Sequence, residues 1–165
     1  MQKALDRMID KIVMMKDTYD ELLRLSLRKK EAIDRGDVAE LEVVVSAEEM
    51  LLMHAGTLEN DRRLIAEEVS AEVGIPVEEL TLGTWPGMDD EKKDRIEKLQ
   101  SAFLGTLSEI TKVNDINSRL LSIQLDYIQQ VVDEVTSTRR ERTYDPVGSA
   151  KSKVSQQFNL LDRTI

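Results

Sequence analysis

The chain has 165 residues, of which 41% are hydrophobic, 4% are aromatic and none is cysteine. The absence of cysteine excludes a disulfide framework and thiolate chemistry. The formal net charge of −9 is uneven, because residues 139–165 hold six Lys/Arg and three Asp/Glu, a balance of +3 that leaves −12 on residues 1–138. An acidic body repels nucleic acid, whose binding depends on Lys and Arg at the phosphates, so we expect no nucleic-acid partner.

Neither a signal peptide nor a membrane span is predicted. The first ten residues, MQKALDRMID, are charged and amphipathic and lack the apolar centre of a signal peptide. No stretch approaches the roughly 18 uncharged apolar residues that a membrane helix needs. We therefore expect a cytoplasmic protein without direct membrane insertion.

Three long helices are predicted, over residues 2–34, 37–73 and 89–138. Apolar residues recur along them at steps of three and four, which is typical of amphipathic helices. Between the first two helices, Gly36 and Asp37 supply a helix stop and a helix start, the signals of a tight helix–helix turn. The stripe of the first helix consists of Leu5, Met8, Ile12, Met15, Tyr19, Leu22 and Ile33, and that of the second consists of Leu41, Val44, Leu51, Ala55, Leu58, Ile65 and Val69.

A connector and a tail complete the predicted organisation. Residues 74–89 hold all but one of the prolines and the only tryptophan, Trp85, which we expect to plug one end of the bundle. Residues 139–165 are predicted to form a flexible tail with a short amphipathic segment at 150–165. That segment could serve as a lid, as a contact to a partner, or as a disordered end.

These elements predict an all-α fold. Two matched helices form an elongated antiparallel hairpin, and a long third helix lies along it as in a coiled-coil-like bundle. The expected organisation is therefore a helical bundle over residues 1–138, followed by the tail.

The centre of the third helix has more apolar surface than one neighbouring hairpin can cover. Two stripes together occupy roughly 200° of the helix, whereas burying one face needs only about 100°. A second copy of the chain, its own tail or another protein must cover the remainder. The first stripe consists of Val113, Ile116, Leu120, Ile123 and Tyr127, and the second consists of Leu121, Leu125, Ile128 and Val132.

Three amide side chains, Asn114, Asn117 and Gln124, lie between these stripes or at their edge. An amide in a helical seam must find a hydrogen-bond partner and thereby fixes the alignment of the helices. One interpretation is that the three amides align an intramolecular bundle. The other is that they bind the backbone or side chains of a helix from another protein.

No candidate catalytic or metal site emerges from the residues. The only histidine, His54, has no cysteine or second histidine to share a metal with, and it lies midway along a long helix without a pocket-forming loop. No glycine-rich phosphate loop is present. Glu48 and Arg62 occupy stripe positions of the second helix and are expected to pair with neighbouring helices. We expect no enzymatic activity, no cofactor and no metal.

Three segments of the sequence carry recognisable motifs: VNDINSRLLSIQLDYIQQVV at residues 113–132, AEEMLLMHAGTLENDRR at 47–63 and TYDPVG at 143–148. Together they resemble the FlgN-like family of flagellar export chaperones, and the first is similar to its N-x-x-N-x-x-LL-x-x-Q signature. Residues 47–63, AEEMLLMHAGTLENDRR, resemble its E-x-x-LL…L-E-x-x-RR pattern, and residues 143–148, TYDPVG, resemble its tail element. The matching positions are Asn114, Asn117, Leu120, Leu121 and Gln124 in the first segment, Glu49, Leu52, Leu58, Glu59, Arg62 and Arg63 in the second, and Tyr144 in the third.

The resemblance implies a chaperone of type III export that binds hook–filament junction proteins through their C-terminal helices, prevents their premature assembly and delivers them to the export gate. Tyr144 matches the tyrosine that contributes to docking on the cytoplasmic domain of the gate. The alternative function is a self-associating structural or adaptor coiled-coil protein, and periodicity does not distinguish it from a chaperone. The protein could also form a homo-oligomer. The candidate client contacts are Asn114, Asn117, Leu121, Gln124, Leu125 and Ile128.

Overall fold

The computed structural model describes residues 2–80, 85 and 88–141. These residues form three long α-helices, α1 (Gln2–Arg35), α2 (Val38–Val73) and α3 (Asp90–Glu141), and a short 3-10 helix, η1 (Val77–Glu79). No strand occurs among the described residues, so the predicted all-α fold is confirmed. The predicted tail beyond residue 141 lies outside them.

The turn between α1 and α2 ends one helix and starts the next within two residues. Gly36 has a positive φ of 65°, which a residue without a Cβ adopts at little cost, and its N–H donates to the Ile33 carbonyl at 3.0 Å. Asp37 then caps α2, because its carboxylate accepts a hydrogen bond from the Glu40 N–H at 3.1 Å. The two helices are therefore antiparallel and adjacent.

Similar signals end α2 and start α3 on the two sides of the connector between them. α2 ends at Gly74, which adopts a left-handed conformation with φ 71°. α3 begins after Asp89, whose carboxylate accepts a hydrogen bond from the Lys92 N–H at 2.7 Å. Trp85 is buried between these points, as the sequence predicts.

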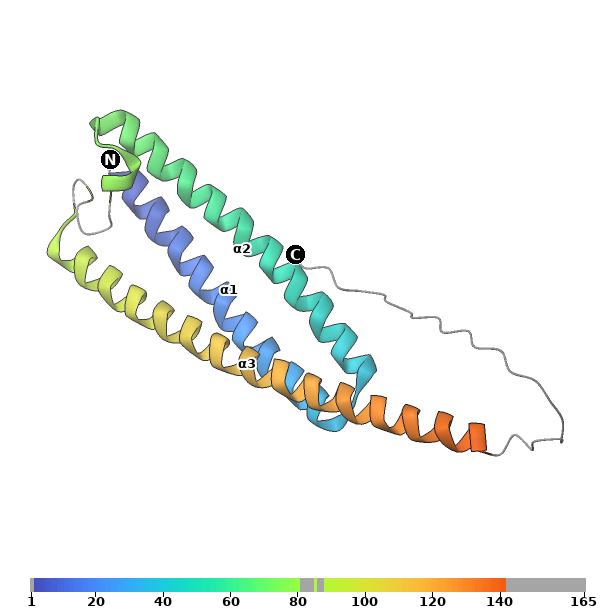
Figure 1. Ribbon diagram of the computed structural model, residues 1–165. Coiled ribbons are helices and arrows are strands. Elements are labelled where there is room, and N and C mark those ends of the chain that lie inside the picture. The colour runs from blue at the N-terminus through green and yellow to red at the C-terminus, as the bar shows by residue number, and fades with distance from the viewer. Residues whose placement is uncertain (1, 81–84, 86–87, 142–165) are drawn as a thin grey trace, which may run out of the picture. The chain divides into compact units, whose positions relative to one another are not determined.

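The chain divides into two compact units, Met1–Asp126 and Tyr127–Ile165. In the first unit α1 lies between α2 and α3, as Figure 1 shows. The core of this unit gathers apolar side chains from all three helices and the connector. It contains Leu5, Met8, Ile9 and Ile12 from α1, Ile65, Ala66 and Val69 from α2, Trp85, and Ile96 from α3.

Ion pairs join α1 to α2 along the hairpin. Lys11 pairs with Asp61 at 2.7 Å, and Lys29 pairs with Glu48 at the same distance. The second pair is largely buried, and the Ser26 hydroxyl also donates to Glu48 at 3.2 Å. The prediction that Glu48 contacts a neighbouring helix is therefore correct, and α1 is that helix.

Candidate protein-binding surface

α3 is held against α1 by side-chain hydrogen bonds to the α1 backbone. Asn117 is 2% exposed, and its Nδ2 donates to the Ser26 carbonyl at 2.9 Å. One heptad further on, the Nε2 of Gln124 donates to the Ile33 carbonyl. Two of the three predicted amides therefore serve the alignment of this bundle, because each fixes α3 at one position along α1.

A third link between α1 and α3 carries a charge. The hydroxyl of Thr106 donates to the Asp20 carboxylate at 2.8 Å. Partial burial disfavours the charged form of Asp20, but hydrogen bonds from Lys16 and Thr106 and the positive charges of Lys16 and Arg24 outweigh it, so the pKa of this carboxyl lies below its ordinary value. The ionised carboxylate therefore stabilises the docking of α3.

Asn114 differs from the other two amides. Its side chain is half-buried, and its Oδ1 accepts no hydrogen bond from the described residues although the atom is shielded from solvent. The Oδ1 of Asn117 is likewise shielded from solvent and accepts no hydrogen bond from the described residues. Both carbonyl oxygens retain capacity as acceptors.

The aliphatic candidates of α3 differ in exposure. In the first unit Leu121 is half-buried and Leu125 is 64% exposed. In the second unit, considered by itself, Ile128 is 56% exposed. The other large apolar side chains that α3 exposes are Leu104, Ile116, Ile123, Tyr127, Val131, Val132 and Val135. Both predicted stripes thus contain exposed members, and clustered exposed apolar side chains indicate a binding surface.

α2 also exposes large apolar side chains, of which the sequence analysis named only Leu52, as a position of the family pattern. They are Val38, Val43, Val45, Met50, Leu52, Met53 and Leu64. The signal was present in the run VAELEVVVSAEEMLLM, residues 38–53, because apolar residues there occupy more than one side of the helix. A single stripe of the predicted width covers only some of them.

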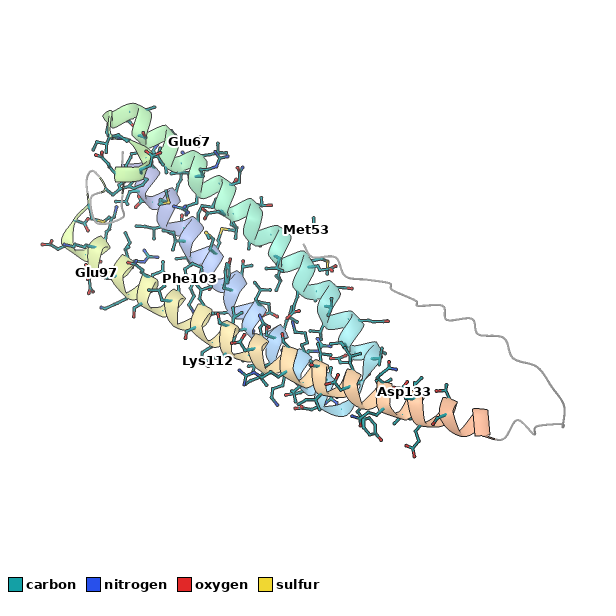
Figure 2. All side chains as sticks on the ribbon, in the orientation of Figure 1. Met53, Glu67, Glu97, Phe103, Lys112 and Asp133 are labelled. Atoms are coloured by element: carbon teal, nitrogen blue, oxygen red, sulfur yellow. The ribbon has the colours of Figure 1, made fainter. Side chains whose placement is uncertain are left out.

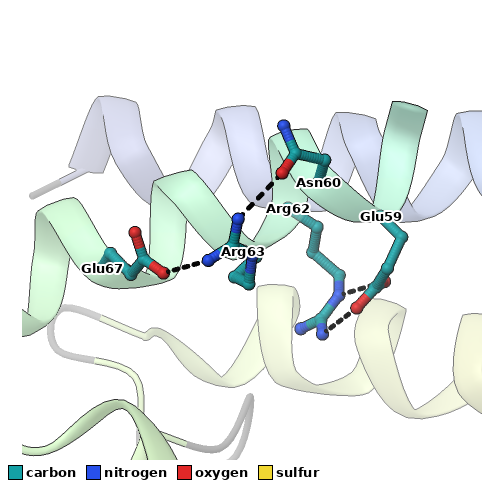
Figure 3. Close-up of polar contacts among 5 residues, drawn as sticks. All are labelled: Glu59, Asn60, Arg62, Arg63 and Glu67. Atoms are coloured by element: carbon teal, nitrogen blue, oxygen red, sulfur yellow. Dashed lines mark hydrogen bonds and ion pairs between the residues drawn. The ribbon is translucent and has the colours of Figure 1, made fainter. Parts of the chain in front are cut away.

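The arginine motif of α2 forms contacts along the surface of its own helix, which Figure 3 shows. Arg62 binds Glu59 through two hydrogen bonds of 2.6 and 2.7 Å, and these bonds raise the pKa of Arg62 and lower that of Glu59. Arg63 binds Glu67 at 2.8 Å and Asn60 at 2.9 Å. The prediction that Arg62 pairs with a neighbouring helix is therefore wrong, because Glu59 lies three residues away on the same face.

A cavity of about 380 Å³ and a second of about 230 Å³ are formed in the first unit. The larger lies along the α1–α2 seam beside Lys11 and Asp61, and the smaller is lined by residues of all three helices, including Arg62 and Phe103.

Within the part of the chain that the structure describes, no group of three or more His, Asp or Glu side chains is arranged to hold a metal ion. Among the described residues, none of the helices has the length and apolar content of a membrane span. Tyr144 lies outside the described residues, as does the segment 150–165.

A bundle of long helices that exposes many large apolar side chains, most of them on α2 and α3, is typical of proteins that bind other proteins. A family model described as FlgN protein matches residues 1–152, and the chain therefore belongs to the FlgN family. FlgN is a family of chaperones and not of enzymes, and membership supports a general role as a flagellar export chaperone.

One relative is the uncharacterized protein YvyG of Bacillus subtilis (strain 168). It is 24% identical over 144 residues, which cover 87% of this chain and 88% of the relative. No solved structure matches the chain.

Proposed function

We propose that the protein is a type III export chaperone for the hook–filament junction proteins of the flagellum. It holds their C-terminal helices in the cytoplasm, prevents premature assembly and delivers them to the export gate. Family membership supports the chaperone role, and the junction proteins are the clients that the signature in α3 implies.

The observation that carries the proposal is that some residues of α3 bind α1 while an apolar neighbour stays exposed to solvent. Asn117 and Gln124 donate to α1, so these two amides hold the helix in place. Leu125, adjacent to Gln124, remains 64% exposed. Leu121, one helical turn before Leu125 on the same face, is half-buried, so the apolar stripe runs beside the residues that anchor the helix.

An amphipathic helix of the client fits this stripe. Such helices place apolar side chains at steps of three and four residues into an apolar face, and Leu121, Leu125 and Ile128 recur at the same steps. Asn114 is assigned to the client contacts by its place in the signature; its Oδ1 is shielded from solvent and reaches a donor on the client only when the half-buried side chain turns outward. Asn117 and Gln124 support the client contacts by fixing α3, because their donor groups are engaged with α1.

Docking on the cytoplasmic domain of the export gate is assigned to Tyr144. The assignment rests on the match of TYDPVG, residues 143–148, to the tail element of the family. Aromatic residues flanked by arginine, here Arg142, are frequent anchors of protein interfaces.

The test is co-purification with full-length junction proteins and with the same proteins lacking their C-terminal helices. We expect a stable complex with the full-length clients and none with the truncated ones. Retention of the truncated clients would contradict the proposed mode of binding. Absence of any complex with the full-length clients would contradict the proposed function.

A further inference from the structure

The smaller cavity lies between α2 and α3, and α1 forms its floor. It is lined by Ile12 and Met15 from α1, Glu59 and Arg62 from α2, and Ile96, Gln100 and Phe103 from α3. The ring of Phe103, labelled in Figure 2, meets the ring of Tyr19 on α1 edge-on, with 5.0 Å between the ring centroids. The cavity therefore identifies the side of α2 that faces α3 and the side of α3 that faces α2.

On α2, the side that faces the cavity continues as an apolar surface toward the turn with α1. Leu52 and Val45 precede Glu59 by seven and fourteen residues, so at about 100° per residue they lie within about 40° of it around the helix. Leu52 is 56% exposed and Val45 is 39% exposed, whereas Val44 and Leu58 on the side toward α1 are buried. We call Val45 and Leu52 the α2 wall.

On α3, the side that faces the cavity also continues as an apolar surface. Leu107, Leu121 and Leu125 lie between the directions of Gln100 and Phe103 around the helix, at about 100° per residue. Leu107 and Leu121 are half-buried, and Leu125 is exposed. We call these three leucines the α3 wall, and two of them are client contacts in the proposed function.

The two walls lie at the same level of the bundle. Glu48, which lies within the range of the α2 wall, pairs with Lys29 of α1 at 2.7 Å. Asn117, which lies within the range of the α3 wall, donates to the Ser26 carbonyl of α1 at 2.9 Å. Ser26 and Lys29 are within one turn of each other. The walls therefore flank the same stretch of α1, and a helix between them completes a four-helix bundle.

Exposed carboxylates border both walls on the side away from α1. Glu42 and Glu49 lie about 60° around α2 from its wall, and Asp115 and Asp126 lie about 100° around α3 from its wall. All four are exposed, and none has a hydrogen-bond or ion-pair partner among the described residues. α2 as a whole holds nine Asp/Glu and two Lys/Arg, a balance of −7. These borders favour a partner helix with Lys or Arg along the edges of its apolar face.

We infer that the client helix lies between the α2 wall and the α3 wall, and that the edges of its apolar face carry Lys or Arg. The inference rests on the proposed function, to which it adds a second contact surface and a charge pattern of the client. Met53 is 75% exposed but lies about 100° around α2 from Leu52, so it stays outside this contact.

The contact with α2 is tested by fluorescence anisotropy with a labelled peptide that carries the client helix. Leu52→Gln should raise the Kd by about fivefold or more, and Met53→Gln, the matched control on α2, should keep the wild-type Kd. If Leu52→Gln binds as the wild type does while Leu125→Glu loses affinity, the client contacts α3 alone, and the inference fails while the proposed function stands. If the wild type does not bind the peptide, the proposed function fails and the inference with it.

The charge pattern is tested by neutralising one carboxylate at the border. At low salt, Asp115→Asn should raise the Kd by about two- to threefold, and the difference from the wild type should shrink as salt screens the charge. Glu109→Gln is the control, because Glu109 is also exposed on α3 but lies about 120° away from Asp115. Equal affinities of the two variants at low salt would overturn the assignment of basic edges to the client.

The occupant itself is identified by cross-linking. Because the chain has no cysteine, Leu52→Cys places a single benzophenone label on the α2 wall. Irradiation with saturating peptide should join the label to the peptide, and mass spectrometry locates the link. A link to residues 142–165 of the same chain, or to a second copy, would assign the space to that occupant and overturn the inference.

Discussion

The substitution Asn117→Asp tests most severely how α3 is held on α1. Asn117 is 2% exposed, and its Nδ2 donates to the Ser26 carbonyl at 2.9 Å. An ionised carboxylate at this place has no donor for that carbonyl and is removed from water. If burial raises the pKa of the new carboxyl by about 3 units, the ionised form costs about 4 kcal/mol at neutral pH, and the lost hydrogen bond adds about 1 kcal/mol.

The pH dependence of this cost has a definite sign. Because the folded-state pKa is raised, the variant approaches wild-type stability below the unfolded pKa of about 3.9 and loses stability as the pH rises through the folded pKa. A protonated carboxyl can donate to the Ser26 carbonyl as the amide does. The difference in stability between variant and wild type therefore shrinks from neutral pH toward about pH 4.

The assay is urea unfolding followed by far-UV circular dichroism at a series of pH values. Asn60→Asp is the control, since it makes the same chemical change at an exposed site beside Arg63, and it is expected to change stability by less than about 0.5 kcal/mol. A variant Asn117→Asp as stable as the wild type at neutral pH would refute the buried amide contact. A cost that does not change with pH would refute the role of ionisation.

Three further predictions follow from other contacts. Leu58 is 2% exposed in the α1–α2 seam, and Leu58→Ala should lower the free energy of unfolding by about 2–5 kcal/mol, whereas Leu104→Ala at an exposed site should have little effect in the same urea assay. Asp20→Asn should reduce the loss of stability on acidification. The lowered pKa of Asp20 stabilises the folded state above the unfolded pKa of about 3.9, and this stability is lost as the pH falls through the folded pKa. A urea series below about pH 5 in which the variant parallels the wild type would contradict this. Tyr144→Ala should keep its client and its helicity but lose affinity for the cytoplasmic domain of the gate in a two-partner binding assay, and undiminished gate binding would show that Tyr144 is not the docking residue.

Much of the fold follows from the sequence because the helices are long and their ends are marked. Helices predicted over residues 2–34 and 37–73 are observed over Gln2–Arg35 and Val38–Val73. Gly36 and Asp37 fix the turn between them through backbone conformation and capping. These signals are local, so they are legible without knowledge of the tertiary structure.

The partners of the polar side chains could not be predicted in the same way. Periodicity places Asn117 and Arg62 on helix faces, but the distance to the next helix decides whether each side chain reaches it. Asn117 reaches the Ser26 carbonyl of α1, whereas Arg62 finds Glu59 three residues away on its own helix. The apolar residues on several sides of α2 posed a related problem, because periodicity does not show which side meets α1.

The most direct test of the client-binding role is a titration of the purified protein with a labelled peptide that carries the C-terminal helix of a hook–filament junction protein. Leu125→Glu is compared with Leu104→Glu, because the two leucines lie on α3 at 64% and 60% exposure and both variants should stay folded. Fluorescence anisotropy should show at least tenfold weaker binding for Leu125→Glu and wild-type binding for Leu104→Glu. Equal affinity of the folded Leu125→Glu variant and the wild type would contradict the assignment of the client to this stripe.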